Sequence, residues 1–241
     1  PDDNLRYPVL VQIGDGSGSG FYFRTEQKLF LVTALHVLYR VEDPGKPLRG
    51  KVIKLTSYDR DLNIEAPIEL AVDLSLAPIR KNDSKDIVLV EIASIQFMTE
   101  RSGGISLGQG IQALTSNAAN IVVVPDGNLK RLKDVLVSNE VFILGYPNSL
   151  GFSGGSQIEP KKPLLRKGII AGQNTLNETI ILDCPVYFGN SGGIAIEIER
   201  NLSEEKFRVI GVVSQYVPFV EHLRSSQWVI QTSTLRTRVI P

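Results

Sequence analysis

The sequence predicts an all-β fold. Short runs rich in β-branched and aromatic residues recur along the whole chain, and clusters of Gly, Pro, Asn and Asp separate them. This alternation is typical of strands joined by tight turns. Helical periodicity is confined to residues 34–40 and to the tail around residues 232–239. Strands at this spacing favour an antiparallel barrel or sandwich.

Each predicted strand is an apolar run that ends at a turn. In the first half the predicted strands are 9–13, 21–24, 29–33, 51–55, 68–73 and 87–92. In the second half they are 141–144, 179–183, 194–198, 207–213 and 228–231. A mixed stretch containing Pro125-Asp126-Gly127 separates the two groups. We therefore expect an N-terminal unit over residues 1–115, a crossover over 116–135 and a C-terminal unit over 136–241.

Composition and charge exclude several classes of partner. The 241 residues are 42% hydrophobic and 22% charged, which is ordinary for a globular protein. Lys plus Arg balance Asp plus Glu at 26 each, so bulk charge draws the chain to neither nucleic acid nor an anionic membrane. No apolar run approaches the roughly 20 residues that span a bilayer. We interpret the basic clusters as solvated loops: Lys130, Arg131 and Lys133, and Lys161, Lys162, Arg166 and Lys167.

The only cysteine is Cys184, so the chain cannot form an internal disulfide. This suits a reducing compartment, and the polar start Pro1-Asp2-Asp3-Asn4 lacks the pattern of a signal peptide. The expected location is cytoplasmic. One cysteine and two distant histidines also offer no ligand spacing for a metal ion.

Two residues of the first half could form a histidine–carboxylate pair. His36 follows an apolar run at the start of a short helical segment, and Asp86 stands at the mouth of the apolar run 87–92. A carboxylate that accepts a hydrogen bond from the imidazole fixes its tautomer and stabilises the imidazolium. Taken alone, each residue is more often structural than catalytic, and Asp83 is a second candidate for the acid.

The second half contains a serine in a glycine-bounded turn, Gly189-Asn190-Ser191-Gly192-Gly193. Glycines let the backbone approach a reacting carbonyl closely. Such a turn can direct the amides of Gly189 and Ser191 at one point, where they would hold the oxyanion of a tetrahedral intermediate. Taken alone, the motif fits an ordinary turn as well as a nucleophile.

Together these segments resemble the trypsin-like (chymotrypsin-fold) serine peptidases, in the disulfide-free bacterial-type branch. The resemblance rests on the order His, Asp, Ser and on five segments: Thr33-Ala34-Leu35-His36-Val37, Asp86-Ile87-Val88-Leu89, Gly145-Tyr146-Pro147, Gly189-Asn190-Ser191-Gly192-Gly193 and Gly211-Val212-Val213-Ser214. It implies two six-stranded antiparallel β-barrels with the active site between them. It also implies a serine endopeptidase that acts on protein or peptide substrates through an acyl-enzyme, with His36, Asp86 and Ser191 as catalytic triad and no cofactor.

The resemblance also implies a specificity pocket. Its two walls would be Pro185, Val186, Tyr187 and Phe188 on one side, and Ser214, Gln215 and Tyr216 on the other. No acid stands where the trypsin subgroup carries one, so we expect cleavage after small or apolar residues. Asp183 lies near enough in sequence to keep Lys or Arg open.

One departure from the family concerns activation. Asn190 precedes the serine, where many family members carry an Asp that pairs with a newly freed N-terminus. We therefore expect a site formed without N-terminal cleavage, or ordered by another signal. Flanking domains of a larger protein are also compatible with the sequence.

Three alternatives compete with this interpretation. Ser153, Asp183 and His222 occur in the order of an α/β-hydrolase triad, but no helix start follows Ser153. Gly14-Asp15-Gly16-Ser17-Gly18 is glycine-rich, yet no Gly-Lys-Ser/Thr follows it. A catalytically silent binding or regulatory module on a peptidase fold also stays open.

Overall fold

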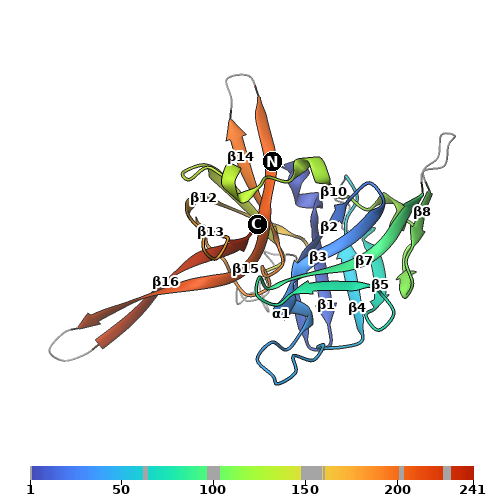
Figure 1. Cartoon of the computed structure of the whole chain (residues 1–241), viewed down its shortest axis with the longest axis horizontal. Coiled ribbons are helices and arrows are strands. Elements are labelled where there is room, and N and C mark those ends of the chain that lie inside the picture. The colour runs from blue at the N-terminus through green and yellow to red at the C-terminus, as the bar shows by residue number, and fades with distance from the viewer. Residues whose placement is uncertain are drawn as a thin grey trace.

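The computed structural model describes residues 2–61, 65–96, 104–147, 159, 161–200, 204–224 and 229–241. Its strands form two separate groups along the chain, a ten-stranded sheet and a closed six-stranded barrel. The two groups pack side by side, with the chain passing once from the first to the second (Figure 1). The mainly β, two-barrel fold predicted from the sequence is confirmed.

The first group contains six long strands, in the order β7-β3-β2-β1-β4-β5 across the sheet. They are β1 (Pro8–Ile13), β2 (Gly16–Arg24), β3 (Lys28–Ala34), β4 (Val52–Ser57), β5 (Ile68–Asp73) and β7 (Ile87–Gln96). All six overlap the strands predicted from the sequence. In β1 buried residues alternate with more exposed ones: Val9, Val11 and Ile13 are buried, whereas Gln12 is exposed. This period of two is what places one face of a strand in a core.

The prediction of six strands for this unit was incomplete. Four short strands join the sheet: β6 (Ile79–Asn82), β8 (Gly104–Leu107), β9 (Ile111–Ala113) and β10 (Val124–Pro125). They have only two to four residues each, too few for a recognisable periodic pattern. Strand β8 pairs with β7 and β9 pairs with β5, so the turn between them joins the two ends of the long-strand path.

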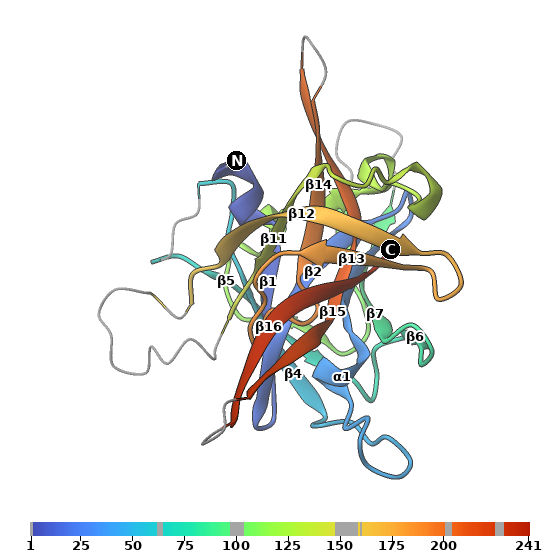
Figure 2. The same cartoon turned by 90° about the vertical axis from the view of Figure 1, so that its left-hand side faces the viewer.

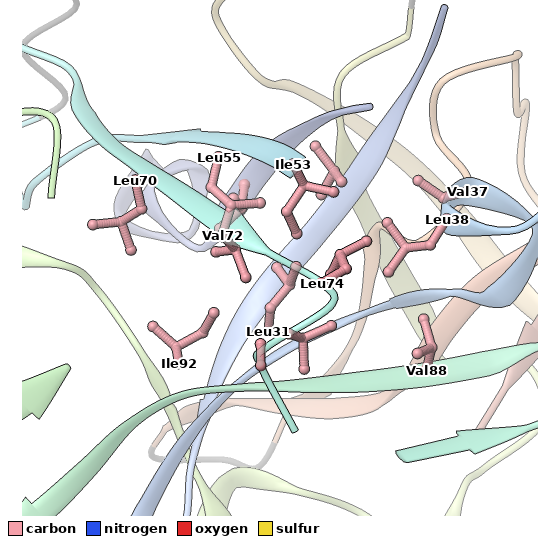
Figure 3. Close-up of a cluster of buried hydrophobic side chains, with 14 of the residues drawn as sticks. Leu31, Val37, Leu38, Ile53, Leu55, Leu70, Val72, Leu74, Val88 and Ile92 are labelled. Atoms are coloured by element: carbon pink, nitrogen blue, oxygen red, sulfur yellow. The ribbon is translucent and has the colours of Figure 1, made fainter. Parts of the chain in front are cut away.

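Buried aliphatic side chains from the strands of this curved sheet point inward and form its core (Figure 3). Leu31, Ile53, Leu55, Leu70 and Val72 are fully buried there. Val37 and Leu38 of the short helix α1 (Leu35–Leu38) join the same cluster. Helix α1 is thereby fixed at the end of β3 by apolar packing.

The second group is a closed barrel in the order β11-β12-β13-β16-β15-β14. Its strands are β11 (Glu140–Gly145), β12 (Leu164–Asn174), β13 (Thr179–Asp183), β14 (Ile194–Arg200), β15 (Glu205–Arg224) and β16 (Val229–Ile240). Strand β12 was not predicted, because Arg166 and Lys167 interrupt its apolar pattern. The helix predicted around residues 232–239 is wrong: this stretch is part of β16, which pairs with both β13 and β15.

Strands β15 and β16 extend beyond the barrel as a long antiparallel ribbon (Figure 1), which points toward the viewer in Figure 2. Their pairing continues to Arg224 opposite Val229. The sequence predicted only 207–213 and 228–231 as strand in this region. Long-range pairing, rather than the local pattern, sets the length of these two strands.

A third apolar cluster joins the two units. Phe21 and Val32 of the first sheet pack with Phe142, Leu144 and Ile194 of the barrel. The chain between the units adds to this contact, since β10 pairs in parallel with β2. The two units are therefore joined by apolar packing and by strand pairing as well as by the chain itself.

An ion pair also fastens the crossover to the barrel. The Nζ of Lys130 lies 2.8 Å from Oε2 of Glu197, whose side chain is fully buried, and it also contacts a carboxylate oxygen of Glu199 at 2.5 Å. Burial alone would lower the pKa of Lys130, but its hydrogen bonds to these carboxylates outweigh burial and raise the pKa. Lys130 therefore neutralises a buried acid.

Replacing this lysine is expected to destabilise the fold. Lys130→Met leaves Glu197 buried without its cation, and we expect a loss of about 3 kcal/mol in the free energy of unfolding at neutral pH. Since the folded-state pKa of Lys130 is raised, its contribution is present at neutral pH and is lost as the pH rises through that pKa. Urea unfolding measures this. The control is Lys206→Met, which removes an exposed pair with Glu204 and is expected to change stability by less than about 1 kcal/mol.

Candidate active site

His36 is positioned by the helix that follows β3. Its neighbours Leu35 and Val37 are buried, whereas the His36 side chain keeps 31% exposure. The backbone N–H of Leu35 donates to the carbonyl of Asp86 at 3.0 Å. The backbone N–H of His36 donates to Oδ1 of Asp86 at 3.1 Å. The start of α1 is thus tied to the residue that precedes β7.

Asp86 accepts hydrogen bonds at both carboxylate oxygens. Besides the bond to Oδ1, the Nδ1 of His36 lies 2.8 Å from Oδ2. The hydroxyl of Ser214, on β15, donates to the same Oδ2 at 2.5 Å. An ionised carboxylate only accepts hydrogen bonds, so the imidazole proton must reside on Nδ1. This leaves Nε2 of neutral His36 as an acceptor.

The ionised form of Asp86 is the favoured one. Burial by itself would raise the pKa of the carboxyl group, but the hydrogen bonds and charge of His36, together with the Ser214 hydroxyl, lower it below its ordinary value. Asp86 also adopts a positive φ of 52°, a left-handed conformation that is strained for most residues with a side chain but that Asp visits more often than others. The strain is offset by the three hydrogen bonds to its side chain.

The turn that carries Ser191 has two glycines at positive φ, Gly189 at 94° and Gly192 at 84°. The N–H of Asn190 donates to the carbonyl of Tyr187 at 3.1 Å. A four-residue turn with this bond and a positive φ at its third residue is a type II turn. Within the part of the chain that the structure describes, neither the amide of Gly189 nor that of Ser191 donates to a backbone carbonyl. Among the described residues, the two amides are therefore left without a backbone acceptor and can serve as oxyanion donors.

His36, Asp86 and Ser191 line one cavity of about 630 Å³ between the two units. Of the predicted specificity residues, Val186, Tyr187, Phe188, Ser214 and Gln215 line it as well. Pro185 does not, and the side chain of Tyr216 lies outside the described residues. The structure thus brings together three residues that are far apart in the sequence, and most of the predicted pocket.

Asp83 and Asp183 are the two competing acids. Asp83 also lines the cavity, but its carboxylate pairs with Lys46 at 3.3 Å and with Lys81 at 3.6 Å. Asp183, at the end of β13, is not among the residues that line the cavity. Of the two, neither is hydrogen-bonded to His36 in the described structure, whereas Asp86 is.

The hydrolase alternative is excluded by the fold. Ser153 and the side chain of His222 lie outside the described residues. The sheets are antiparallel except where β10 pairs with β2, whereas an α/β-hydrolase requires a mostly parallel sheet with covering helices. Cys184 is buried, and burial raises the pKa of its thiol to about 12, so it is no thiolate nucleophile at neutral pH.

Asn190 points into the protein and is only 2% exposed. A neutral amide there needs no countercharge, whereas a buried carboxylate would. Asn190 in place of the family's Asp is thus compatible with a turn that is stable without an N-terminal ion pair.

Arg166 supports one wall of the pocket, because its guanidinium lies 4.7 Å from the ring centroid of Tyr187.

The bond from Ser214 to Asp86 was not foreseen. The sequence placed Ser214 on a strand that would contact substrate, and 128 positions separate it from Asp86. No local pattern could indicate this contact.

In the described ranges, no group of three or more His, Cys, Asp and Glu side chains could hold a metal ion. The same ranges contain no helix long and apolar enough to cross a membrane.

A hydrogen-bonded His–Asp pair beside a serine in a glycine-bounded turn, set between two β-barrel units, defines the class of two-barrel serine peptidases. Residues 18–202 match the family model of the trypsin-like peptidase domain. The chain belongs to this family. No curated protein matches the sequence significantly.

Solved structures share this fold at low sequence identity. The thermostable serine protease AL20 from an extremophilic microorganism is 12% identical, with a TM-score of 0.55 over 100% of this chain and 92% of that one. Deg5 is 18% identical, with a TM-score of 0.50 over 89% and 81%. The HtrA-type protease AlgW with tripeptide is 16% identical, with a TM-score of 0.53 over 98% of this chain. The chain spans only 56% of AlgW.

Proposed function

We propose that this chain is a serine endopeptidase in which Ser191 is the nucleophile, His36 the general base and Asp86 the residue that orients His36. The observation that carries the proposal is the 2.8 Å contact between Nδ1 of His36 and Oδ2 of Asp86, in the cavity that Ser191 lines. Membership of a peptidase family supports peptide or protein substrates.

The reaction follows from the proton positions. Oγ of Ser191 attacks the peptide carbonyl while Nε2 of His36 accepts its proton, and the imidazolium is stabilised by ionised Asp86. The amides of Gly189 and Ser191 hold the oxyanion. His36 then gives the proton to the leaving nitrogen as the carbon–nitrogen bond breaks. Water, deprotonated in turn by His36, hydrolyses the acyl-enzyme and restores Ser191.

Substrate backbone is proposed to pair with β15 beside the cavity. Strand β15 pairs with β14 only as far as Val212, and from Ser214 onward its described backbone pairs on one side only, with β16. An exposed strand edge of this kind accepts an extended peptide as an added strand. This would bring the scissile carbonyl toward the turn of Ser191.

Fluorophosphonate labelling tests the proposal. We expect a single covalent adduct on Ser191, located by mass spectrometry, and its absence in Ser191→Ala and His36→Ala. The control is Ser57→Ala, a buried serine of β4 that does not line the cavity, which should label like the native chain. A folded native chain without an adduct would contradict the proposal and favour the catalytically silent module.

Cleavage is expected after small or apolar residues. Val186 and Val213 line the cavity, and so does Arg238, whose guanidinium donates to the amide oxygen of Gln215 at 3.2 Å. The Arg238 guanidinium disfavours a substrate cation placed beside it. We expect a peptide library to show kcat/KM about 100-fold lower for Lys or Arg before the cut than for Ala or Val. Selection for Lys or Arg would contradict this prediction.

A further inference from the structure

Ser19 of β2 makes two hydrogen bonds to the nucleophile turn, and neither was predicted from the sequence. It comes from the first unit and is completely buried. Its hydroxyl donates to the carbonyl of Gly189 at 2.7 Å, and its backbone N–H donates to the carbonyl of Ser191 at 2.8 Å. One residue of the first unit therefore holds two carbonyls of the turn in the second.

The remaining polar groups of Ser19 are used as well. Its hydroxyl oxygen accepts the N–H of Tyr146 at 2.8 Å, and its backbone carbonyl accepts the hydroxyl of Thr33 at 2.6 Å. The hydroxyl hydrogen is thus directed to Gly189, because Tyr146 occupies a lone pair of the same oxygen. Burial strengthens these bonds and makes the loss of any one costly.

These contacts fix the orientation of one peptide plane. The carbonyl of Gly189 is held by Ser19, and the N–H of Asn190 in the same peptide unit is held by the carbonyl of Tyr187. With both ends held, the plane cannot turn freely about its flanking bonds. This plane lies between the two peptides that carry the Gly189 and Ser191 amides. Holding it limits ψ of Gly189 and φ of Asn190, two of the torsions that set the direction of the two amides relative to each other.

We propose that Ser19 is a positioning residue that assembles the oxyanion hole across the boundary between the two units. The inference rests on the proposed function. Without the Ser19 hydroxyl, the Gly189 carbonyl is buried and lacks its donor. The Gly189–Asn190 peptide can then turn toward another partner. Such a turn changes ψ of Gly189 and φ of Asn190, so the Gly189 and Ser191 amides no longer point at the same oxyanion.

The expected kinetic effect lies in the transition state. Loss of one oxyanion donor costs about 100- to 1000-fold in kcat, and Ser19→Ala loosens the donor without deleting it. We expect kcat to fall about 10- to 100-fold while KM changes less than about twofold. Affinity for a peptide boronic acid, which mimics the tetrahedral intermediate, should fall by a similar factor, and affinity for the cleaved peptide product should not.

Two further variants separate positioning from general stability. Ser19→Cys keeps the shape but is a weak donor, so we expect a kcat between those of the native chain and Ser19→Ala. Ser57→Ala removes a different buried hydroxyl of the same sheet and is expected to leave kcat unchanged. A fall in kcat that merely follows the melting temperature across the three variants would overturn the proposal, as would a raised KM at constant kcat.

Failure of the proposed function can be told apart from failure of this inference. If the native chain reacts with the fluorophosphonate, the kinetic comparison decides the role of Ser19. If it does not, crystal structures of the native chain and Ser19→Ala decide it instead. A reoriented Gly189–Asn190 peptide in the variant supports the role, and an unchanged turn, with Gly189 still at positive φ, overturns it.

Discussion

Asp86→Asn is expected to lower kcat by about 10,000-fold at neutral pH, with little change in KM. The carboxylate accepts one hydrogen bond from the His36 ring Nδ1–H at Oδ2 and another from the His36 backbone N–H at Oδ1. An amide that keeps the oxygen at one position must present its NH₂ at the other. It then favours the wrong imidazole tautomer or loses a buried bond, and it no longer stabilises the imidazolium.

The matched control is Asp83→Asn, because Asp83 lines the same cavity but pairs with Lys46 and Lys81. We expect its kcat to stay within about threefold of the native value, since exposed ion pairs contribute little. Steady-state kinetics on one peptide measures both variants. Equal effects of the two substitutions, or an Asp86→Asn chain with native kcat, would contradict the assigned role of Asp86.

The lowered pKa of Asp86 also predicts how the stability of the fold depends on pH. Because the pKa of Asp86 is lowered in the folded state, its ionised form favours folding above its unfolded pKa. The contribution is lost as the pH falls through the lower, folded pKa. We therefore expect the native chain to melt above Asp86→Asn at pH 7 and the difference to shrink toward pH 3. A difference that grows on acidification would contradict the lowered pKa.

The fold was predictable where the local pattern repeats. Strands in which buried and exposed residues alternate, such as β1, were recognised from their residues alone. The same holds for apolar runs such as β14. Strand β12 was missed because charged side chains interrupt it, and the tail was mistaken for a helix although β16 pairs on both sides. In both places tertiary pairing overrides the local preference.

The residues of the candidate site could be predicted from the sequence, but the hydrogen bonds that connect them to their neighbours could not. The segments around His36, Asp86 and Ser191 carry local motifs, so the three residues could be named before their cavity was known. The contacts of Ser214 with Asp86 and of Ser19 with Gly189 span 128 and 170 positions. Such contacts depend on how the two units meet, and a single sequence contains no periodic signal for that.

Gly192→Ala is expected to have the largest effect on the assembly of the site. Gly192 has a φ of 84°, which costs any other L-residue about 1–2 kcal/mol. A Cβ at this position would also overlap the carbonyl oxygen of Ser19 and the hydroxyl of Thr33. Neither can move away cheaply, because the two are hydrogen-bonded to each other at 2.6 Å. Overpacking of this kind adds about 1–3 kcal/mol.

The turn can relieve the overlap only by moving away from β2. That movement breaks the bond from Ser19 to the Ser191 carbonyl and strains the bond from the Gly192 N–H to Val213. We therefore expect Gly192→Ala to lose at least about 100-fold in kcat as well as several kcal/mol of stability. The control is Gly172→Ala in β12, where an added Cβ meets no atom within 4 Å. Native activity in a stable Gly192→Ala chain would show that the nucleophile turn does not depend on its contact with the first unit.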